Sequence, residues 1–387
     1  MFTFNPYSRE IDGNPFPYYQ TLRDEHPCYW SEEGQCWVLT RYEDVYAAAQ
    51  NWEAFSSAKG NMLDDFPERT GRTLGTTDAP RHDHLRSLAQ AAFSRKNVDY
   101  LIEPIRDIAN EAIDQFIDKG KFEFIGEFSS PVTVATLSYL LGIPKDDHKE
   151  IRRNVVLALQ ADPETNQKGP ENIAAFQWLK DYAATMLEVR RANPQDDLLT
   201  HLMQAEIEGD KLSDEEVLMT TTTLIMAGVE SASSFMTNFT LNLVDHPDAL
   251  KRLVAEPKLM PDAIEESLRF NTSAQRFRRT LTCDKELHGQ TMKAGDKVLL
   301  CWGAANRDER KFPNPDVYDI DRKPRGHLGM GTGKHLCLGA PIARLLIRTA
   351  METLLQRIPD LRKTEQQLEW ISSTTFRAPV ALELEFG

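Results

Sequence analysis

The sequence of 387 residues contains few cysteines, no long apolar run and no internal repeat or low-complexity segment. Its five cysteines are odd in number and scattered, and none are closer than the eight positions between Cys28 and Cys36. This spacing excludes a disulfide framework or a zinc pattern and fits a reducing compartment. Because the N-terminal residues have neither a basic region nor an apolar stretch, we expect no secretory signal and no membrane anchor. We therefore predict a cytoplasmic protein.

Basic residues are also outnumbered in this chain. It has 45 Lys and Arg against 59 Asp and Glu, which gives a formal net charge of −14. A protein of this charge repels phosphate backbones and anionic lipid surfaces, so we expect neither nucleic acid nor membrane as a partner. Hydrophobic residues make up 41% of the sequence and charged residues 27%, the balance of an ordinary globular enzyme. Because no Gly/Ser-rich or Pro-rich linker divides the chain, we interpret residues 1–387 as a single domain.

Helical periodicity dominates the sequence. Apolar residues recur at intervals of three and four over 95–118, and a second predicted helix covers 129–141. The longest predicted helix covers about 213–245, and Ser213 with Glu216 forms a capping box at its start. A helix of this length is about 45 Å long, enough to cross a whole domain.

Polar residues in this long helix distinguish a transmembrane helix from a buried helix of a globular domain. Glu230 and four consecutive threonines interrupt the apolar run, which excludes a transmembrane helix and indicates a central buried one. Alternating patterns predict strands of a small sheet within 276–308 and a last strand within 380–386. The fold class is therefore mainly α with a smaller β subdomain.

The densest functional signal is the segment Gly329–Gly339, which has four glycines in eleven residues. Glycine brings no side chain and tolerates positive φ, so such a backbone can lie flat against a planar group. Cys337 stands just before a predicted helix, where the helix dipole favours the thiolate that an iron ligand must be. A phosphate-binding loop is excluded because His335 stands where Ser or Thr is required. The other four cysteines are interpreted as buried apolar residues.

This segment resembles the heme loop of the cytochromes P-450, heme-thiolate monooxygenases, and specifically of their soluble bacterial members. The loop is commonly F-G-x-G-x-H-x-C-x-G, and here it reads M-G-T-G-K-H-L-C-L-G, with Met330 where the aromatic residue usually stands. The resemblance covers nearly the whole chain. It implies the cytochrome P-450 fold, with the helix of about 213–245 over the heme, and Cys337 as the axial ligand of iron in heme b (iron protoporphyrin IX). Heme contacts are also implied for Met330, Gly331 and Gly339.

A second matching motif is E-x-x-R. Glu266 and Arg269 lie three positions apart, on one face of a predicted helix, where they can form an ion pair. Burying such a pair is costly unless another hydrogen-bonding group completes it. The resemblance supplies this group from the segment before the heme loop, and Arg322 matches it.

A third group of residues resembles the cations that bind the heme propionates in this family. His82 and Arg86 match its H-x-x-x-R motif, and their spacing of four places both on one helix face. Arg279 matches its strand arginine and His335 the histidine of its heme loop. Four such residues around one dianionic cofactor are harder to explain as surface charge than any one alone.

The middle of the long helix reads A-G-V-E-S and resembles the family motif A-G-x-[DE]-T. The resemblance places Ala227 against the heme, and Gly228 predicts a helix opened to admit dioxygen. Glu230 and Ser231 correspond to the acid and alcohol that deliver protons during dioxygen activation. Because serine replaces the more usual threonine, we expect a working but leakier coupling of electrons to product. An alternative is that the Ser231 hydroxyl only bonds back to its own helix.

Candidate substrate contacts follow from periodicity and from the resemblance. Helical spacing places Thr223 on the face of Ser231 and Met226 near it. Strand alternation places Gln275 and Phe277 on the face of Arg279. The resemblance adds Phe376, and the mixture of apolar and hydroxyl side chains suggests a small or medium apolar substrate with one polar group.

The first functional hypothesis is a monooxygenase that inserts one oxygen atom of O2 into such a substrate, by hydroxylation or O-dealkylation. One alternative is a heme-thiolate peroxygenase that uses H2O2, and a second is a non-catalytic heme protein that binds a gas or another ligand. The acid and alcohol of the long helix favour the monooxygenase, because neither alternative requires them.

Electrons must come from a separate partner, because the chain contains no recognisable flavin or iron–sulfur segment. The resemblance implies a small ferredoxin or flavodoxin that an NAD(P)H-dependent reductase reduces, and we expect the enzyme itself to be a monomer. Since such partners are acidic, the cysteine side of the heme is expected to be locally basic. The candidates for this basic patch are Arg81, Arg86, Lys334, Arg344 and Arg348.

Overall fold

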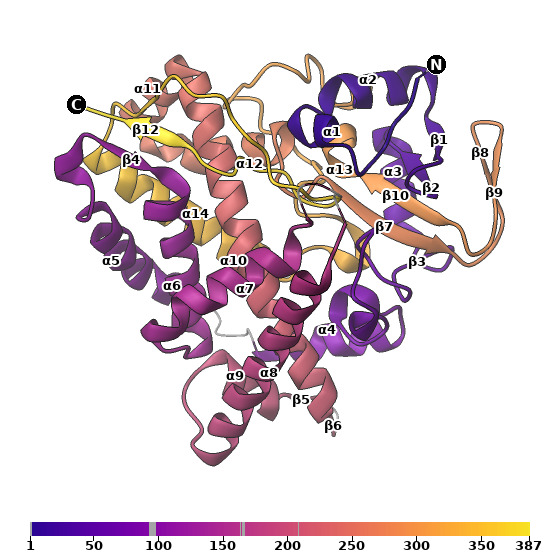
Figure 1. Cartoon of the computed structure of the whole chain (residues 1–387), viewed down its shortest axis with the longest axis horizontal. Helices are drawn as coiled ribbons and strands as arrows, with labels where there is room; N and C mark the ends of the chain where they lie inside the picture. The colour runs from indigo at the N-terminus through magenta and orange to yellow at the C-terminus, as the bar shows by residue number, and fades with distance from the viewer. Residues whose placement is uncertain (1, 93–97, 163, 165–166, 208) are drawn as a thin grey trace.

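The computed structural model describes residues 2–92, 98–162, 164, 167–207 and 209–387. Helices fill one side of the molecule and the largest sheet lies on the other (Figure 1). The helices are α1 (Arg9–Gly13), α2 (Phe16–Glu25), α3 (Tyr42–Gln50), α4 (Arg81–Ala92), α5 (Ile102–Ile113), α6 (Ser130–Leu141), α7 (His148–Leu159), α8 (Pro170–Ala192), α9 (Leu198–Gln204), α10 (Asp214–Asp245), α11 (Pro247–Ala255), α12 (Met260–Phe270), α13 (Trp302–Ala305) and α14 (Ala340–Arg357).

The largest sheet joins strands that are far apart in the sequence. Its order is β1-β2-β10-β7-β3, and β10 is parallel to β2 and antiparallel to β7. A three-stranded sheet has the order β11-β12-β4, and two hairpins, β5-β6 and β8-β9, complete the described strands. The bounds are β1 (Cys28–Ser31), β2 (Cys36–Leu39), β3 (Phe55–Ser56), β4 (Lys121–Glu123), β5 (Glu206–Ile207), β6 (Asp210–Lys211), β7 (Arg276–Leu281), β8 (Lys285–Leu287), β9 (Gln290–Met292), β10 (Lys297–Cys301), β11 (Arg362–Lys363) and β12 (Glu383–Glu385).

Most predicted elements are present, with shorter bounds. The predicted helix over 95–118 is represented by α5, and its first residues lie outside the described ranges. The strand region 276–308 contains β7 to β10, but the chain turns into α13 directly after Cys301. The C-terminal strand is confirmed only over Glu383–Glu385.

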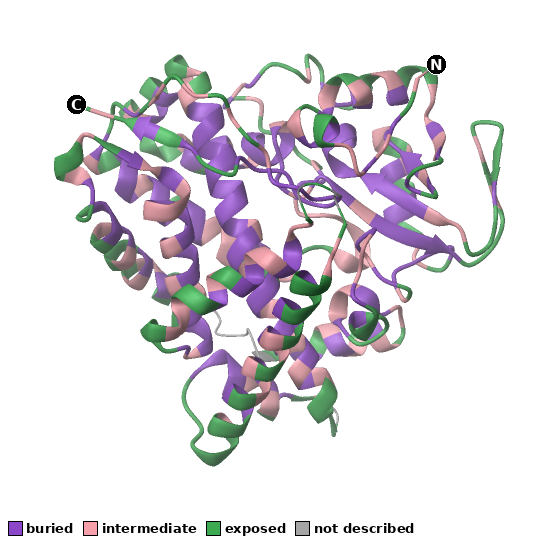
Figure 2. Cartoon of the chain, in the orientation of Figure 1, coloured by how far each residue is buried: buried purple, intermediate pink, exposed green. Residues whose placement is uncertain are grey.

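Helix α10 is the long central helix that the sequence predicts. The Ser213 hydroxyl accepts the backbone N–H of Glu216 at 3.3 Å, and the Glu216 carboxylate accepts the backbone N–H of Ser213 at 2.9 Å. This capping box satisfies two N–H groups that the first helical turn otherwise leaves unpaired. The helix crosses the molecule and is buried along most of its length (Figure 2). Among the described residues, no helix is long and apolar enough to cross a membrane.

Two apolar clusters meet along α10. Its N-terminal half, Val217 to Val229, packs with α4, α7, α8 and α9. Its C-terminal half, Ala232 to Leu243, packs with α5, α6, α12 and α14. Residues 227–231, which carry the candidate acid and alcohol, therefore lie at the junction of the two clusters.

Candidate active site

The loop before α14 is held in one shape by backbone contacts. The N–H of Cys337 donates to the carbonyl of Met330 at 2.9 Å, and Gly331 has a φ of +73°, which favours glycine. A side chain at Gly333 would place its Cβ 2.9 Å from the carbonyl oxygen of Ala49. The glycines of this segment therefore serve a tight turn and a close approach to α3.

Cys337 is exposed at the end of this loop, and a Cβ at Gly339 would meet no other atom within 4 Å. Burial among the surrounding residues raises the pKa of the Cys337 thiol. The backbone N–H groups of Gly339 and Ala340 and the nearby guanidinium of Arg344 act in the opposite direction. The residue is thus accessible at its exposed side, and N–H dipoles and a cation favour the thiolate of its partly enclosed sulfur.

The guanidinium of Arg86 connects α4 to this loop. It donates to the carbonyls of Lys334 at 3.1 Å and Leu336 at 2.8 Å. These bonds fix the two residues that flank His335, and they use donors of Arg86 that would otherwise need another acceptor.

Two histidines and a buried arginine lie nearby, and among the described residues only His82 has a carboxylate within ion-pair distance, that of Asp83 at 3.1 Å. The rings of His82 and His335 are 4.5 Å apart, and the buried Nε2 of His82 has no hydrogen-bond partner. Burial and neighbouring cations, Arg279 first, lower the pKa of His335 to about 3. Burial also lowers the pKa of Arg279 to about 10, and no carboxylate of the described residues forms an ion pair with it. These groups fit an anionic ligand, which would supply the missing acceptors and charge.

The middle of α10 presents an accessible stripe on an otherwise buried helix. Ala227 is exposed, and Thr223 and Ser231 are partly exposed at spacings of four residues. The Thr223 hydroxyl has no hydrogen-bond partner within the described part of the chain, whereas the Ser231 hydroxyl donates to the carbonyl of Ala227. Leu338, which follows Cys337, packs against the apolar cluster that contains this half of α10. The stripe and the cysteine loop therefore border the same apolar region.

Glu230 lies on another face of α10. Its Oε1 accepts from the Gln160 amide at 3.4 Å and from the Ser234 hydroxyl at 3.3 Å. Burial raises the pKa of Glu230, and these two hydrogen bonds oppose this shift. The carboxyl and the Ser231 hydroxyl are adjacent in sequence but bond to different partners.

The predicted ion pair of α12 is fully buried. Two nitrogens of Arg269 donate to the two carboxylate oxygens of Glu266 at 2.8 Å, and Nε of Arg322 donates to the same carboxylate at 3.1 Å. Arg269 also donates to the carbonyls of Asn306 at 3.0 Å and Pro315 at 2.8 Å. The structure brings all three predicted residues together.

Comparison with known proteins agrees with this geometry. A family model described as Cytochrome P450 matches residues 163–362. The mycinamicin IV hydroxylase/epoxidase of Micromonospora griseorubida is 34% identical over 359 residues, covering 90% of this chain and 89% of that protein. The methyl-branched lipid omega-hydroxylase of Mycobacterium tuberculosis is 34% identical over 368 residues, covering 92% and 85%. CYP109E1 from Bacillus megaterium, solved with testosterone, has a TM-score of 0.90 at 30% identity and covers 98% of this chain and 100% of that one.

The chain belongs to the cytochrome P450 family. Cytochromes P450 are oxidoreductases that carry heme b on a cysteine thiolate and use dioxygen, so the predicted fold, enzyme class and cofactor are confirmed. The open thiol, the unpartnered imidazole nitrogen and the uncompensated guanidinium fit this anionic cofactor.

The structure of this P450 differs from the sequence interpretation at Gly228. Helix α10 is helical throughout Asp214–Asp245, so no opened segment is present. A Cβ at Gly228 would lie 3.0 Å from the Leu137 side chain of α6. The glycine is thus explained by the close approach of two helices.

One predicted substrate contact lies elsewhere. Gln275 precedes β7 and does not follow its alternation: its amide donates to the carbonyl of Thr272 at 2.6 Å, and its oxygen accepts from the Tyr19 hydroxyl at 3.3 Å. Met226 is only 3% exposed and lies in the same apolar cluster as Phe376, so its contact with substrate stays a prediction. Phe277 and Phe376 contact each other, with ring centroids 6.2 Å apart.

The expected basic patch is neutralised by acidic neighbours. Arg86 is bound to loop carbonyls, and the other four candidates pair with carboxylates: Arg81 with Glu216, Lys334 with Asp83, Arg344 with Glu265, and Arg348 with Glu352. The predicted excess of positive charge is therefore wrong for the four paired residues, whereas Arg86 keeps a charge that no described carboxylate pairs with.

Gln160 is the functional candidate that sequence reasoning missed. It follows α7 in a loop and is 70 positions from Glu230, so neither periodicity nor a motif connects the two. Only the packing of α7 against α10 brings its amide to the carboxyl of Glu230.

Proposed function

We propose that this P450 is a monooxygenase that inserts one oxygen atom of O2 into a small or medium apolar substrate, with Cys337 as the iron ligand. The observation that carries the proposal is the exposed thiol beside a buried guanidinium without an ion-pair partner and two imidazoles, bordering an apolar region that the α10 stripe also lines. The single domain over 1–387, the monomeric state and the cytoplasmic location stay predictions.

The residues that would hold the cofactor are of two kinds: polar side chains for its propionates and small or apolar residues around its ring. Bound heme b supplies the iron at which dioxygen is reduced and split, so that one of its atoms enters the substrate and the other leaves as water. Arg279 would bind a propionate as a cation, and the imidazoles of His82 and His335 would bind the propionates as N–H donors, His82 through its partnerless Nε2. Arg86 would add charge there while it fixes the cysteine loop. Met330, Gly331, Gly339 and Ala227 would form the apolar walls.

Glu230 and Ser231 of α10 would deliver protons during the reaction. Because burial raises the pKa of Glu230, its carboxyl can hold a proton closer to neutral pH than an exposed glutamate can. To release that proton toward the stripe, the side chain must leave the Gln160 amide and the Ser234 hydroxyl. The Ser231 hydroxyl lies on the accessible face and can turn from the Ala227 carbonyl toward a ligand.

The substrate would lie against aromatic and hydroxyl side chains. The names of similar relatives and structures mention mycinamicin IV, a methyl-branched lipid and testosterone. Phe277 and Phe376 and the partnerless hydroxyl of Thr223 would contact it here.

Electrons would come from a ferredoxin or flavodoxin reduced by an NAD(P)H-dependent reductase. Because most of the candidate basic residues are already paired with carboxylates, we expect docking to depend only weakly on ionic strength. Partner-driven turnover measured between low and high salt tests this, and a steep loss of turnover with salt would contradict it.

The absorption spectrum of the reduced, carbon monoxide-bound enzyme tests the central assignment. The long-wavelength Soret band of a thiolate ligand should be present in the wild type and in Cys283→Ala, which removes another exposed cysteine, and absent in Cys337→Ala. If Cys337→Ala keeps that band, Cys337 is not the ligand. Peroxide-driven turnover that rivals electron-driven turnover would instead favour the peroxygenase.

A further inference from the structure

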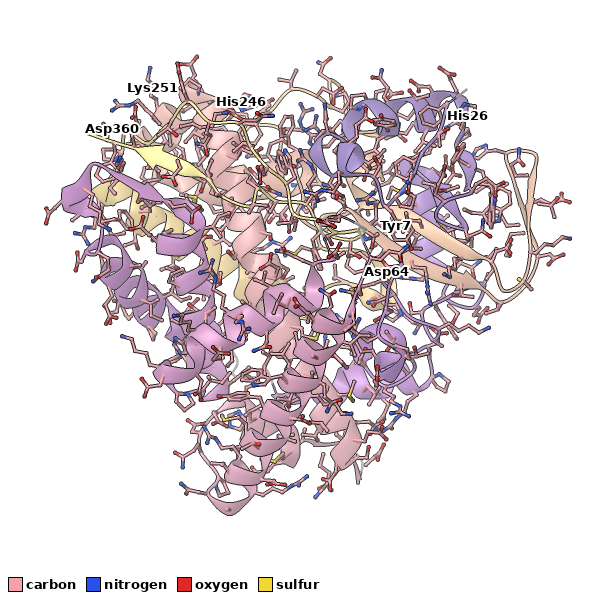
Figure 3. All side chains as sticks on the ribbon, viewed as in Figure 1. Tyr7, His26, Asp64, His246, Lys251 and Asp360 are labelled. Carbon is pink, nitrogen blue, oxygen red and sulfur yellow. The ribbon has the colours of Figure 1, made fainter. Side chains whose placement is uncertain are left out.

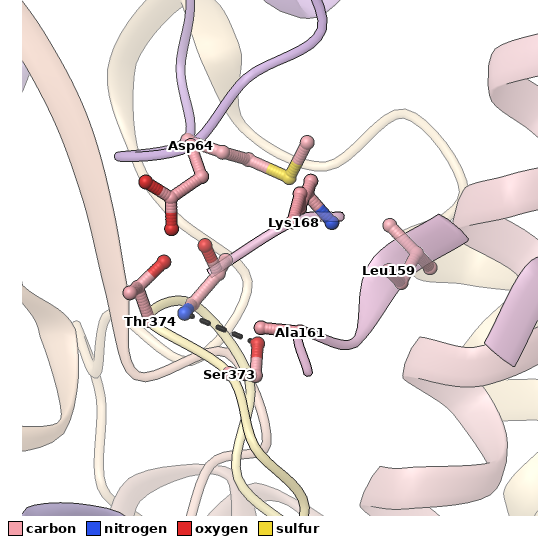
Figure 4. Close-up of a pocket in the computed structure, with 8 residues that line it drawn as sticks. Asp64, Leu159, Ala161, Lys168, Ser373 and Thr374 are labelled. Carbon is pink, nitrogen blue, oxygen red and sulfur yellow. Dashed lines mark hydrogen bonds between the residues drawn. The ribbon is translucent and has the colours of Figure 1, made fainter. Parts of the chain in front are cut away.

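A narrow polar pocket lies where three distant segments meet (Figure 4). The loop after β3 contributes Met62 and Asp64, the end of α7 and the following loop contribute Leu159, Ala161 and Lys168, and the C-terminal loop contributes Ser373, Thr374 and Thr375. None of these residues was assigned a role above.

Lys168 is the cation of this pocket. Its ammonium donates to the carbonyls of Ala158 at 2.5 Å and Gln160 at 3.3 Å, and it lies 4.9 Å from the centre of the Phe66 ring. Within the described residues, no carboxylate is within ion-pair distance of it. Burial lowers the pKa of Lys168 to about 8. Two neutral carbonyls satisfy two of its three donors but do not balance its charge.

The neighbouring charges do not supply the missing anion. Asp64 accepts from the Tyr7 hydroxyl at 2.8 Å, beside which it lies in Figure 3, and Asp65 pairs with Arg69 at 2.5 Å. Arg278, which interacts with both carboxylates, has a buried Nε without a partner. Among the described residues, Lys168, Arg69 and Arg278 thus share the carboxylates Asp64 and Asp65, on which Lys297 also acts, so positive charge is in excess around the pocket.

The pocket also offers a hydroxyl donor and opens onto apolar surface. Ser373 Oγ accepts the backbone N–H groups of Thr375 at 3.3 Å and Phe376 at 3.0 Å, so its own proton is free for a ligand. Met62 and Leu159 belong to the apolar cluster against which Leu338, beside Cys337, also packs. The polar pocket and the cysteine loop therefore border the same apolar cluster.

We propose that Lys168 binds the carboxylate of an otherwise apolar substrate, with Ser373 as a second donor, and so selects acids over neutral compounds of the same shape. This rests on the proposed function, because it presumes that the apolar region holds the substrate. The carboxylate would take the third donor of the ammonium and balance its charge in a poorly solvated place, where charge-assisted hydrogen bonds are strong.

Binding to the heme-loaded enzyme tests this, with dodecanoic acid and methyl dodecanoate as probes of equal chain length and different charge. Dissociation constants are measured by calorimetry and by the spin-state change of the heme. We expect the wild type to bind the acid at least about tenfold more tightly than the ester. Lys168→Met should abolish this preference and leave the affinity for the ester within about twofold, whereas Lys168→Arg should retain most of the preference.

Asn172→Ser is the matched control, because the Asn172 amide also donates to the carbonyl of Gln160, at 3.2 Å, without lining the pocket. This variant loosens the same segment and removes no charge, so it should keep the preference for the acid. Equal binding of acid and ester by the wild type, or equal losses in Lys168→Met and Asn172→Ser, would overturn the proposal. Neither result would affect the carbon monoxide spectrum, which tests the proposed function separately.

Discussion

Arg269 offers the sharpest test of how this fold supports its cysteine loop. The side chain is fully buried and donates to both carboxylate oxygens of Glu266 and to the carbonyls of Asn306, Pro315 and Val317. Asn306 in turn accepts the backbone N–H of Leu328 at 2.6 Å, just before the loop. Arg269→Met removes the charge and all five hydrogen bonds while it keeps much of the volume.

The expected loss of stability depends on the hydrogen-bond partners that Glu266 keeps in Arg269→Met. Glu266 keeps the Arg322 guanidinium and the backbone N–H of Asp319, each at 3.1 Å. Breaking a buried ion pair from one side costs about 3–5 kcal/mol. Because Arg322 still compensates part of the charge, we expect about 3 kcal/mol, or roughly a hundredfold change in the unfolding equilibrium. Arg322→Met, at a partly exposed position, should cost about 1–2 kcal/mol.

The assay is urea unfolding of the heme-loaded enzyme followed by circular dichroism, with heme retention read from the Soret band. The double variant Glu266→Met/Arg269→Met leaves no unpaired buried carboxylate, so it should be more stable than Arg269→Met alone. The reasoning is refuted if Arg269→Met unfolds within about 1 kcal/mol of the wild type, or if the double variant is the less stable of the two.

Three further predictions concern α10 and the polar pocket. Ser231→Ala should lower product formed per electron and raise peroxide release several-fold, and unchanged coupling would show that Ser231 has no part in proton delivery. Gly228→Val should cost about 1–3 kcal/mol by overpacking, and adding Leu137→Ala should recover part of this; failure to recover any would contradict the close approach of α6. Because the pKa of Lys168 is lowered to about 8, its ammonium is present below that pH, so affinity for dodecanoic acid should fall as pH rises from 7 to 9. The ester should show no such change, and a parallel fall for both probes would contradict the assignment.

The sequence predicted best what local chemistry determines. The capping box of Ser213 and Glu216 depends on a spacing of three, and it stands in the structure as expected. The glycine-rich loop around Cys337 is likewise a local pattern. The helix that carries Glu266 and Arg269 was also predicted from local spacing, although the burial of their ion pair comes from segments distant in the chain.

Long-range packing explains what the sequence could not provide. The predicted substrate contact of Gln275 was wrong because strand β7, and with it the alternation of faces, begins one residue later, at Arg276. The basic patch was predicted without its partner carboxylates, because these come from other parts of the fold, as Glu265 does for Arg344. Gly228 does lie within the long helix as predicted. The physical reason for a glycine there is the close approach of the Leu137 side chain from a neighbouring helix.

One short segment connects the two functional regions of this P450. The carbonyl of Gln160 accepts from Lys168 at 3.3 Å and from Asn172 at 3.2 Å, while its side-chain amide donates to Glu230 at 3.4 Å. A carboxylate that takes the third donor of the ammonium would leave these bonds in place, so the ligand and the backbone of Gln160 would share one cation. Because the amide at the same residue helps to hold the buried carboxyl of Glu230, occupation of the pocket and release of that carboxyl depend on one piece of backbone. If Lys168 binds a substrate carboxylate as proposed, the anchor of the substrate and the hydrogen bond that holds Glu230 would thus both lie at the C-terminal end of α7.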